Sequence, residues 1–274
     1  RQRQCKDSGR TIGGNHEFDV VELSGVDRVW TLTVYSGVNV VIIFSCSKSS
    51  VTLLSVLCLA WLSFPVNESF ADEAETSKPD FKKWEASIQK FESQDKQMPQ
   101  PTGANLFVGS SSIRMWKLGQ SFPMFKTINR GFGGSEIADS IHFADRIILK
   151  YQPAVIVLYA GDNDISRGKS AEIVTADFQK FARVVRKKLP ATRIAFIAIK
   201  PSIKRWNLAG EIRVANKAIA AICAADEKMD YVDIFNPMLG KDGKPMPELF
   251  LKDGLHLNEQ GYKIWAKAIQ PLLK

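Results

Sequence analysis

Residues 154–164 read Ala-Val-Ile-Val-Leu-Tyr-Ala-Gly-Asp-Asn-Asp. An uninterrupted apolar run that is rich in β-branched residues is typical of a strand buried on both faces, and such strands belong to parallel sheets covered by helices. The glycine and the polar residues that follow mark the end of the strand. Functional side chains in these sheets gather beyond the carboxyl ends of the strands. The stretch therefore predicts both a fold class and the place to look for a site.

Four more runs of this kind accompany the strand at 154–159, and they lie at 105–108, 127–129, 193–199 and 231–235. Between the runs, apolar residues recur three and four positions apart, which indicates amphipathic helices. The two clearest helical faces are Val174, Phe178, Phe181 and Val185, and Leu208, Ile212, Ala215, Ile219 and Ile222. Alternating strands and helices predict an α/β fold, a three-layer α/β/α sandwich around a five-stranded parallel sheet with right-handed crossovers.

The beginning of the chain differs in character from the rest. Residues 1–36 show no sustained apolar period, and we leave them unassigned. Residues 37–71 contain an apolar run at 51–64, followed by the small-x-small pattern Ser69-Phe70-Ala71, which is the order of a signal peptide and its cleavage point. We expect cleavage after Ala71 and export to the periplasm, the cell envelope or the medium. An uncleaved anchor is the alternative, because apolar residues reach back to Val38.

Residues 72–103 are predicted to form a linker and one amphipathic helix laid against the domain that follows. The helical spacing is that of Phe81, Trp84, Ile88 and Phe91. Pro99 and Pro101 then end the helix. The remaining residues, 104–274, form the sheet domain.

Charge and cysteine content exclude several classes of protein. The 274 residues include 37 Lys and Arg against 29 Asp and Glu, for a net charge of +8. The densest basic group, around 180–188, has no interleaved aromatic residues, so we interpret it as a solvated helix face and expect no nucleic-acid partner. The four cysteines have no zinc-like spacing, and we expect neither a metal nor a disulfide framework. Cys223 lies on an apolar helix face and is expected in the core.

Polar stretches follow the predicted strands. They are Gly-Ser-Ser-Ser-Ile-Arg at 109–114, Asn-Arg-Gly-Phe-Gly-Gly-Ser at 129–135, Gly-Asp-Asn-Asp at 161–164, Lys-Pro-Ser at 200–202 and Asp-Gly-Leu-His at 253–256. Each alone is a common turn or helix cap. Together they hold what acyl transfer requires: a serine hydroxyl, a histidine base with a carboxylate partner, and donors for an oxyanion. We expect the strands that lead to Gly134 and Asn163 to be neighbours in the sheet.

From about Phe81 to Lys274 the chain resembles the SGNH/GDSL hydrolase superfamily, whose sequence blocks contribute a Ser, a Gly, an Asn and a His. It is most similar to a bacterial subgroup with five blocks in the order found here. They are Phe-Val-Gly-Ser-Ser-Ser-Ile-Arg-x-Trp at 107–116, the glycine-rich block at 129–135, Tyr-Ala-Gly-Asp-Asn-Asp at 159–164, Lys-Pro-Ser…Arg-Trp at 200–206 and Asp-Gly-Leu-His-Leu at 253–257. The resemblance implies a flavodoxin-like fold.

The resemblance also implies a role for each matching residue. The nucleophile falls on Ser111, the base on His256 and the partner of the base on Asp253. The oxyanion hole falls on the backbone N–H of Ser111, on Gly134 and on Asn163. No cofactor and no metal belong to this arrangement.

One block departs from the family pattern, because Gly-Asp-Ser-Leu reads Gly-Ser-Ser-Ser at 109–112. The assignment of Ser111 therefore rests on the alignment, and we expect Ser110 to be a turn residue and Ser112 a helix cap. Arg130 and Trp206 follow strand ends and are candidate substrate contacts. Arg130 is equally suited to bracing its loop through an acidic neighbour.

Three functions remain open. The first is a secreted serine ester hydrolase, for which we expect short acyl groups or carbohydrate O-acetyl esters, with lipid esters as a further option. The second is an acyltransferase that uses the same site, and the third is a non-catalytic carbohydrate-binding relative. The expected partner is a small-molecule or glycan ester, with membrane contact only if the apolar N-terminal segment stays uncleaved.

Overall fold

The computed structural model describes residues 20–25, 28–33, 44–46 and 80–274. The chain divides into two compact units, 1–73 and 74–274, which we describe separately. In the first unit, β1 (Val20–Gly25), β2 (Arg28–Thr33) and β3 (Phe44–Cys46) pair as an antiparallel sheet in that order. The sequence pattern does not predict these strands. The apolar run of the predicted signal peptide and its cleavage point lie outside the described residues.

The second unit contains the predicted five-stranded parallel sheet. Its strands are β4 (Asn105–Gly109), β5 (Thr127–Gly131), β6 (Val155–Tyr159), β7 (Arg193–Ile197) and β8 (Met229–Val232). They pair in the order β5-β4-β6-β7-β8, and every pairing is parallel. The strands that lead to Gly134 and Asn163 are β5 and β6, and β4 lies between them. The prediction that these two strands are neighbours is therefore wrong.

Two strand ends differ from the prediction because side chains form hydrogen bonds with the backbone there. The strand predicted at 231–235 ends at Val232, since the Asp233 carboxylate accepts hydrogen bonds from the backbone N–H groups of Phe235 and Asn236. The strand predicted at 193–199 ends at Ile197. Beyond it, the backbone of Ile199 bonds to the side-chain amide of Asn216 instead of a neighbouring strand.

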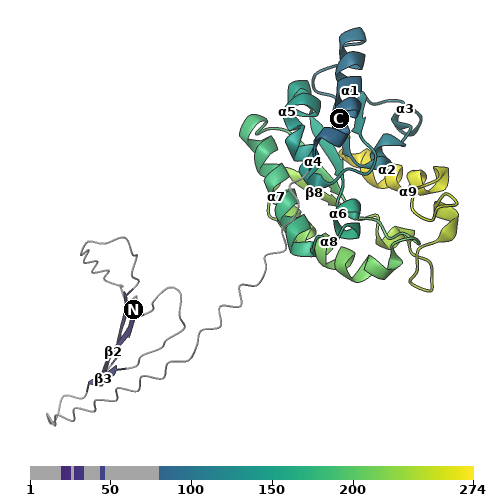
Figure 1. Cartoon of the computed structure of the whole chain (residues 1–274). Helices are drawn as coiled ribbons and strands as arrows, with labels where there is room; N and C mark the ends of the chain where they lie inside the picture. Colours follow the sequence, from purple (N-terminus) through teal and green to yellow (C-terminus); the bar gives the residue numbers. More distant parts are fainter. Residues whose placement is uncertain (1–19, 26–27, 34–43, 47–79) are drawn as a thin grey trace. The chain divides into compact units, whose positions relative to one another are not determined.

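Helices cover both faces of the sheet (Figure 1). They are α1 (Glu85–Gln97), α2 (Ser111–Arg114), α3 (Leu118–Ser121), α4 (Ile137–His142), α5 (Ala144–Ile147), α6 (Asp162–Ser166), α7 (Ala171–Lys188), α8 (Ala209–Ala224) and α9 (Glu259–Ile269). Short 3-10 turns join them: η1 (Lys82–Trp84), η2 (Leu149–Tyr151), η3 (Trp206–Leu208), η4 (Asn236–Met238), η5 (Pro247–Leu249) and η6 (Gln270–Leu272). Helix α7 packs against α4 and α8, and α3 packs against α9. The architecture is the predicted three-layer sandwich.

The core follows the predicted apolar pattern. Strands β4 and β6 are buried along their whole length, as expected for parallel strands covered on both faces. All four residues of the predicted α7 face are buried, and so are Ile212, Ala215 and Ile219 of α8. Ile88 of α1 is fully buried, which fixes this helix to the domain as predicted. The described part of the chain contains no helix that is long and apolar enough to span a membrane.

Candidate active site

Ser111 stands where β4 turns into a short helix. Gly109 ends the strand with a φ of +126°, and a Cβ at this position would lie 1.9 Å from the carbonyl oxygen of Tyr159 on β6. Only glycine fits, because a side chain would collide with the neighbouring strand. The chain then turns at Ser110, and Ser111 is the first residue of α2. The tight turn places the half-buried Ser111 at the carboxyl edge of the sheet.

His256 connects Ser111 to a carboxylate. Its Nε2 lies 3.0 Å from Oγ of Ser111, and its Nδ1 lies 2.6 Å from Oδ2 of Asp253. The other carboxylate oxygen of Asp253 accepts hydrogen bonds of 2.9 Å from the backbone N–H groups of Leu255 and His256. Burial alone raises the pKa of Asp253, but these hydrogen bonds from His256 and the backbone outweigh it and hold the pKa well below its usual range. Asp253 is therefore ionised at neutral pH and orients the imidazole.

Ser111 is the one member of the serine triplet that contacts His256 in the described structure. Ser110 is buried in the turn that precedes α2, which agrees with its predicted place. Ser112 lies inside α2 rather than capping it, and the structure corrects that prediction. Its side chain is buried, while its carbonyl accepts a hydrogen bond of 2.8 Å from the hydroxyl of Tyr262 on α9.

Three hydrogen-bond donors lie on the segments that follow β4, β5 and β6. Within the described residues, the backbone N–H groups of Ser111 and Gly134 have no protein acceptor. Gly134 adopts a φ of +78°, a conformation that favours glycine. The third donor is Asn163 in α6, whose Nδ2 donates to the carbonyl of Ser135 at 2.9 Å. A primary amide carries two N–H bonds, so this contact leaves one of them available.

Arg167 holds the glycine loop in place, a role that the sequence analysis did not predict. Its Nη1 lies 2.5 Å from Glu136, and its Nη2 donates to the carbonyl of Gly134 at 3.0 Å. The contact holds the peptide group that follows Gly134. The signal for this role in the sequence is weak, because an exposed arginine in a loop is common.

A buried charged cluster lies behind Asn163. The carboxylate of Asp162 pairs with Nζ of Lys200 and with Nη1 of Arg205, each at 2.6 Å. Lys200 also donates to the hydroxyl of Tyr159 at 3.0 Å. Burial by itself raises the pKa of Asp162, but the charges of Lys200 and Arg205 together hold it below the usual value. In the sequence, the available clue to this cluster was Lys200, which directly follows a predicted buried strand. A buried lysine requires a charged or polar partner.

Arg130 does not face the site. It is buried, and its guanidinium pairs with Asp95 of α1 and donates to the hydroxyl of Tyr151 at 2.7 Å. The candidate role of Arg130 as a substrate contact is thus contradicted, and the alternative, a bracing ion pair, is what the structure has. Trp206 lies half-buried in η3, where it lines a pocket of about 640 Å³ with Ile203 and loop 240–248.

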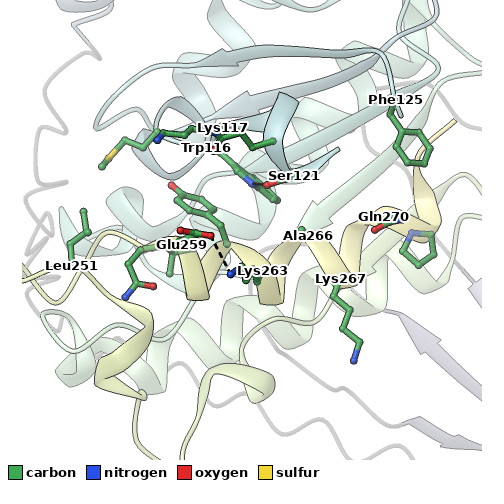
Figure 2. A pocket seen from close by; sticks show the side chains of 16 residues that line it. Trp116, Lys117, Ser121, Phe125, Leu251, Glu259, Lys263, Ala266, Lys267 and Gln270 are labelled. Carbon is green, nitrogen blue, oxygen red and sulfur yellow. Dashed lines mark hydrogen bonds and ion pairs between the residues drawn. The ribbon is translucent and has the colours of Figure 1, made fainter. Parts of the chain in front are cut away.

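A groove with both apolar and polar side chains in its lining runs along α9 (Figure 2). Its volume is about 830 Å³, and its apolar lining consists of Met115, Trp116, Phe125, Leu251, Leu257, Tyr262, Ala266 and Pro271. Leu251 and Phe125 lie toward opposite ends of the groove. The Leu251 end is connected to the segment that carries His256, since the N–H of Leu251 donates to the carbonyl of His256 at 2.8 Å.

The sequence matches a known family over the same region. The model of the GDSL-like Lipase/Acylhydrolase family aligns with residues 109–264, more than half of the chain, and this span includes the serine, glycine, asparagine, aspartate and histidine described above. The chain belongs to this family. Membership of the GDSL-like acylhydrolases supports a hydrolase activity.

Solved structures of GDSL-like proteins share the fold. A GDSL-like lipase from Bacteroides thetaiotaomicron is 20% identical with a TM-score of 0.60, over 70% of this chain and 98% of that one. A protein from Streptococcus pneumonia provisionally named a platelet activating factor is 22% identical with a TM-score of 0.63, over 71% and 94%. An acetylxylan esterase from Geobacillus stearothermophilus is 13% identical with a TM-score of 0.51, over 64% and 95%. No curated protein sequence gives a significant match.

Proposed function

We propose that this GDSL-like protein is a carboxylic ester hydrolase that works through Ser111, His256 and Asp253. The observation that carries the proposal is the continuous contact from Asp253 through His256 to Ser111, with atom separations of 2.6 and 3.0 Å. Both distances are within the reach that a serine nucleophile and its base require. A protein that only binds carbohydrate has no need for this arrangement.

The first half of the reaction forms an acyl-enzyme. His256 Nε2 takes the proton from Oγ of Ser111 as that oxygen attacks the ester carbonyl. The negative charge on the carbonyl oxygen is stabilised by the N–H groups of Ser111 and Gly134 and by the amide of Asn163. The C–O bond of the ester then breaks, and the protonated His256 gives its proton to the departing alcohol.

The second half returns the enzyme to its starting state. A water molecule attacks the acyl carbon while His256 removes its proton, and the same donors stabilise the second oxyanion. Collapse of this intermediate breaks the bond to Oγ of Ser111, which regains its proton from His256. Asp253 remains ionised throughout and stabilises the imidazolium that forms twice in each cycle.

The substrate that we propose is a short-acyl ester, with O-acetyl groups on carbohydrate as the favoured class. Two considerations support it: the chain has no long insertion between its motif blocks that could cover a lipid, and the predicted signal peptide would deliver the enzyme to extracellular glycans. One protein with the same fold is an acetylxylan esterase. We therefore propose that the protein acts outside the cytoplasm.

The groove along α9 favours a second candidate, an ester with a longer apolar chain. The groove is lined by Leu257, the residue that follows His256 in the chain, and by Trp116 and Ala266. Burying an apolar chain there would contribute roughly 0.8 kcal/mol per methylene group. Chain-length preference is thus the property that separates the two candidates.

The test is hydrolysis of p-nitrophenyl esters, from acetate to long acyl chains, by the wild-type protein and by Ser111→Ala and His256→Ala. We expect both variants to lose more than about 1000-fold in kcat. Ser112→Ala is the matched control, because it removes the neighbouring hydroxyl in the same helix. Activity that survives Ser111→Ala would contradict the proposed nucleophile. A rate that rises with chain length would favour the second candidate substrate.

A further inference from the structure

Arg205 joins the charged cluster to the side chain that we propose as an oxyanion donor. The residue follows β7 in the loop before η3, and its side chain is only 17% exposed. Its Nη1 donates to Oδ1 of Asp162 at 2.6 Å, and its Nη2 donates to Oδ1 of Asn163 at 3.1 Å. One planar guanidinium therefore holds two consecutive residues of α6 at once.

The guanidinium itself has a fixed anchor. Asp162 binds Arg205 through one carboxylate oxygen and Lys200 through the other, and Lys200 is 1% exposed. Tyr159, at the end of β6, accepts a further hydrogen bond from Lys200. Because breaking a buried ion pair is costly, the cluster resists rearrangement. The position of Arg205 is thus set by the sheet and not by solvent.

The contacts of Asn163 determine which way its amide points. Its Oδ1 accepts from Arg205, and its Nδ2 donates to the carbonyl of Ser135. The flipped amide would place its oxygen against the Ser135 carbonyl and its NH₂ group against a cation, so both contacts would become repulsive. The observed orientation leaves the second N–H of Nδ2 for an oxyanion. A charged donor on Oδ1 also polarises the amide and strengthens that N–H as a donor.

We propose that Arg205 is a positioning residue for ester hydrolysis, which holds the amide of Asn163 in the orientation that stabilises the oxyanion. This inference rests on the proposed function. Arg205 acts through Asn163 and not on the substrate. Its effect is confined to the tetrahedral states, because the oxyanion exists only there. Loss of Arg205 therefore lowers kcat and leaves KM nearly unchanged.

The experiment is a double-mutant cycle in the full chain with p-nitrophenyl acetate as substrate. Asn163→Ala removes the donor, and we expect kcat to fall on the order of 100- to 1000-fold. Arg205→Met removes the guanidinium but keeps an unbranched side chain, and we expect a loss of roughly 10- to 100-fold in kcat with KM within about twofold. The double variant should match Asn163→Ala alone, since Arg205 then has nothing to position.

Two further variants separate positioning from general damage to the fold. Arg193→Met removes an arginine that pairs with Asp230 between β7 and β8, and we expect its kcat to stay at the wild-type value. Arg205→Lys keeps the charge next to Asp162, so it supports the fold, but a single ammonium group lacks the two-pronged geometry. We expect Arg205→Lys to have a native melting curve and a kcat between those of the wild type and Arg205→Met. If Arg205→Met fails to fold, Arg205→Lys replaces it in the cycle.

Four results would overturn the inference. Full activity of Arg205→Lys and Arg205→Met would show that the orientation of the amide does not depend on Arg205. A raised KM with unchanged kcat would make Arg205 a substrate contact. Losses that multiply in the double variant would show that Arg205 acts independently of Asn163. Full activity of Asn163→Ala would overturn the proposed oxyanion hole as well, whereas the first three results leave the proposed function standing.

Discussion

At the scale of single residues, backbone geometry gives three identical side chains different surroundings. Ser110, Ser111 and Ser112 are neighbours in sequence, yet only the second lies within hydrogen-bonding distance of His256. The glycine that ends β4 forces the turn, and the start of α2 then sets the direction of each side chain. Residue type alone cannot identify the nucleophile, because the identity of Ser111 depends on where the strand stops.

Asp253→Asn is expected to keep the fold and lose most of the activity. An amide in place of the carboxylate can donate to Nδ1 of His256, which would favour the tautomer with its proton on Nε2, the wrong one for a base. We expect kcat for p-nitrophenyl acetate to fall by about 10⁴-fold, as estimated for triads of this kind. A loss smaller than about tenfold would contradict the role of Asp253.

The same variant has a pH-dependent effect on stability. The pKa of Asp253 is lower in the folded protein than its reference value of 3.8, so its ionised form favours folding. This contribution is complete above about pH 4 and is lost as the pH falls through the lower folded pKa. The difference in unfolding free energy between wild type and Asp253→Asn should therefore be constant near neutral pH and shrink below pH 4. Urea unfolding monitored by circular dichroism checks both ranges.

At the scale of elements, α9 combines two tasks. Its N-terminal end follows His256 in the chain, and one of its sides lines the groove. Trp265 points into the core and is fully buried, whereas Ala266 faces the groove. The small side chain of Ala266 leaves the groove open, which makes this position suited to a test of what the groove binds.

Ala266→Trp is expected to fill the groove and shift chain-length preference. If the groove holds an acyl chain, kcat/KM for long-chain p-nitrophenyl esters should fall about tenfold or more, while the value for the acetate ester stays unchanged. Ala221→Trp adds the same ring at an exposed position of α8 and serves as the matched control. Equal losses for every ester would show that the ring disturbs the fold instead. Unchanged values for all chain lengths would rule out the groove as the acyl site.

Much of the fold could be predicted at this scale, and the reasons are physical. The apolar periods of α1, α7 and α8 and the continuous runs of the strands report burial directly, and burial is what organises the layers. The ends of the strands were harder to predict from sequence, because Asp233 and Asn216 end two strands through side-chain hydrogen bonds. The order of the strands in the sheet could not be predicted either, since a local sequence pattern does not reveal that β4 lies between β5 and β6.

The candidate active site, like the fold, could be predicted from the sequence only in part. The sequence motifs predicted Ser111, Asp253 and His256, because each of these residues has a fixed position in a short motif at the end of a strand or just before a helix. The sequence could not decide between the two roles considered for Arg130, substrate contact and bracing ion pair, because its partners Asp95 and Tyr151 come from distant parts of the chain. The cluster of Asp162, Lys200 and Arg205 was missed for a related reason, because it joins α6 with the loop after β7 only in three dimensions.

At the scale of the whole molecule, the reactivity of the Cys223 thiol can be used to detect unfolding of the domain. Its thiol is buried, and burial raises its pKa to about 12. Only about one thiol in 10,000 would be ionised at pH 8, and thiol reagents attack the thiolate. We expect no labelling of Cys223 by iodoacetamide in the native protein at pH 8 and complete labelling after unfolding in guanidinium chloride. Peptide mapping by mass spectrometry identifies the labelled cysteine.

The midpoint of Cys223 labelling should coincide with loss of the circular dichroism signal, since the core that covers the thiol belongs to the same cooperative unit. Lys217→Cys introduces a thiol at an exposed position of the same helix, and it should be labelled in the native state. Rapid native labelling of Cys223 itself would show that α8 detaches without global unfolding.

The proposed nucleophile and its base are 145 positions apart in the chain. Strands β5 to β8 and the cluster behind Asn163 are encoded between them. During synthesis, Ser111 leaves the ribosome long before His256 is translated, so the nascent chain has a serine without a base. The proposed esterase would therefore be inert while it is being made, and its activity would begin only when the end of the domain folds back onto its beginning.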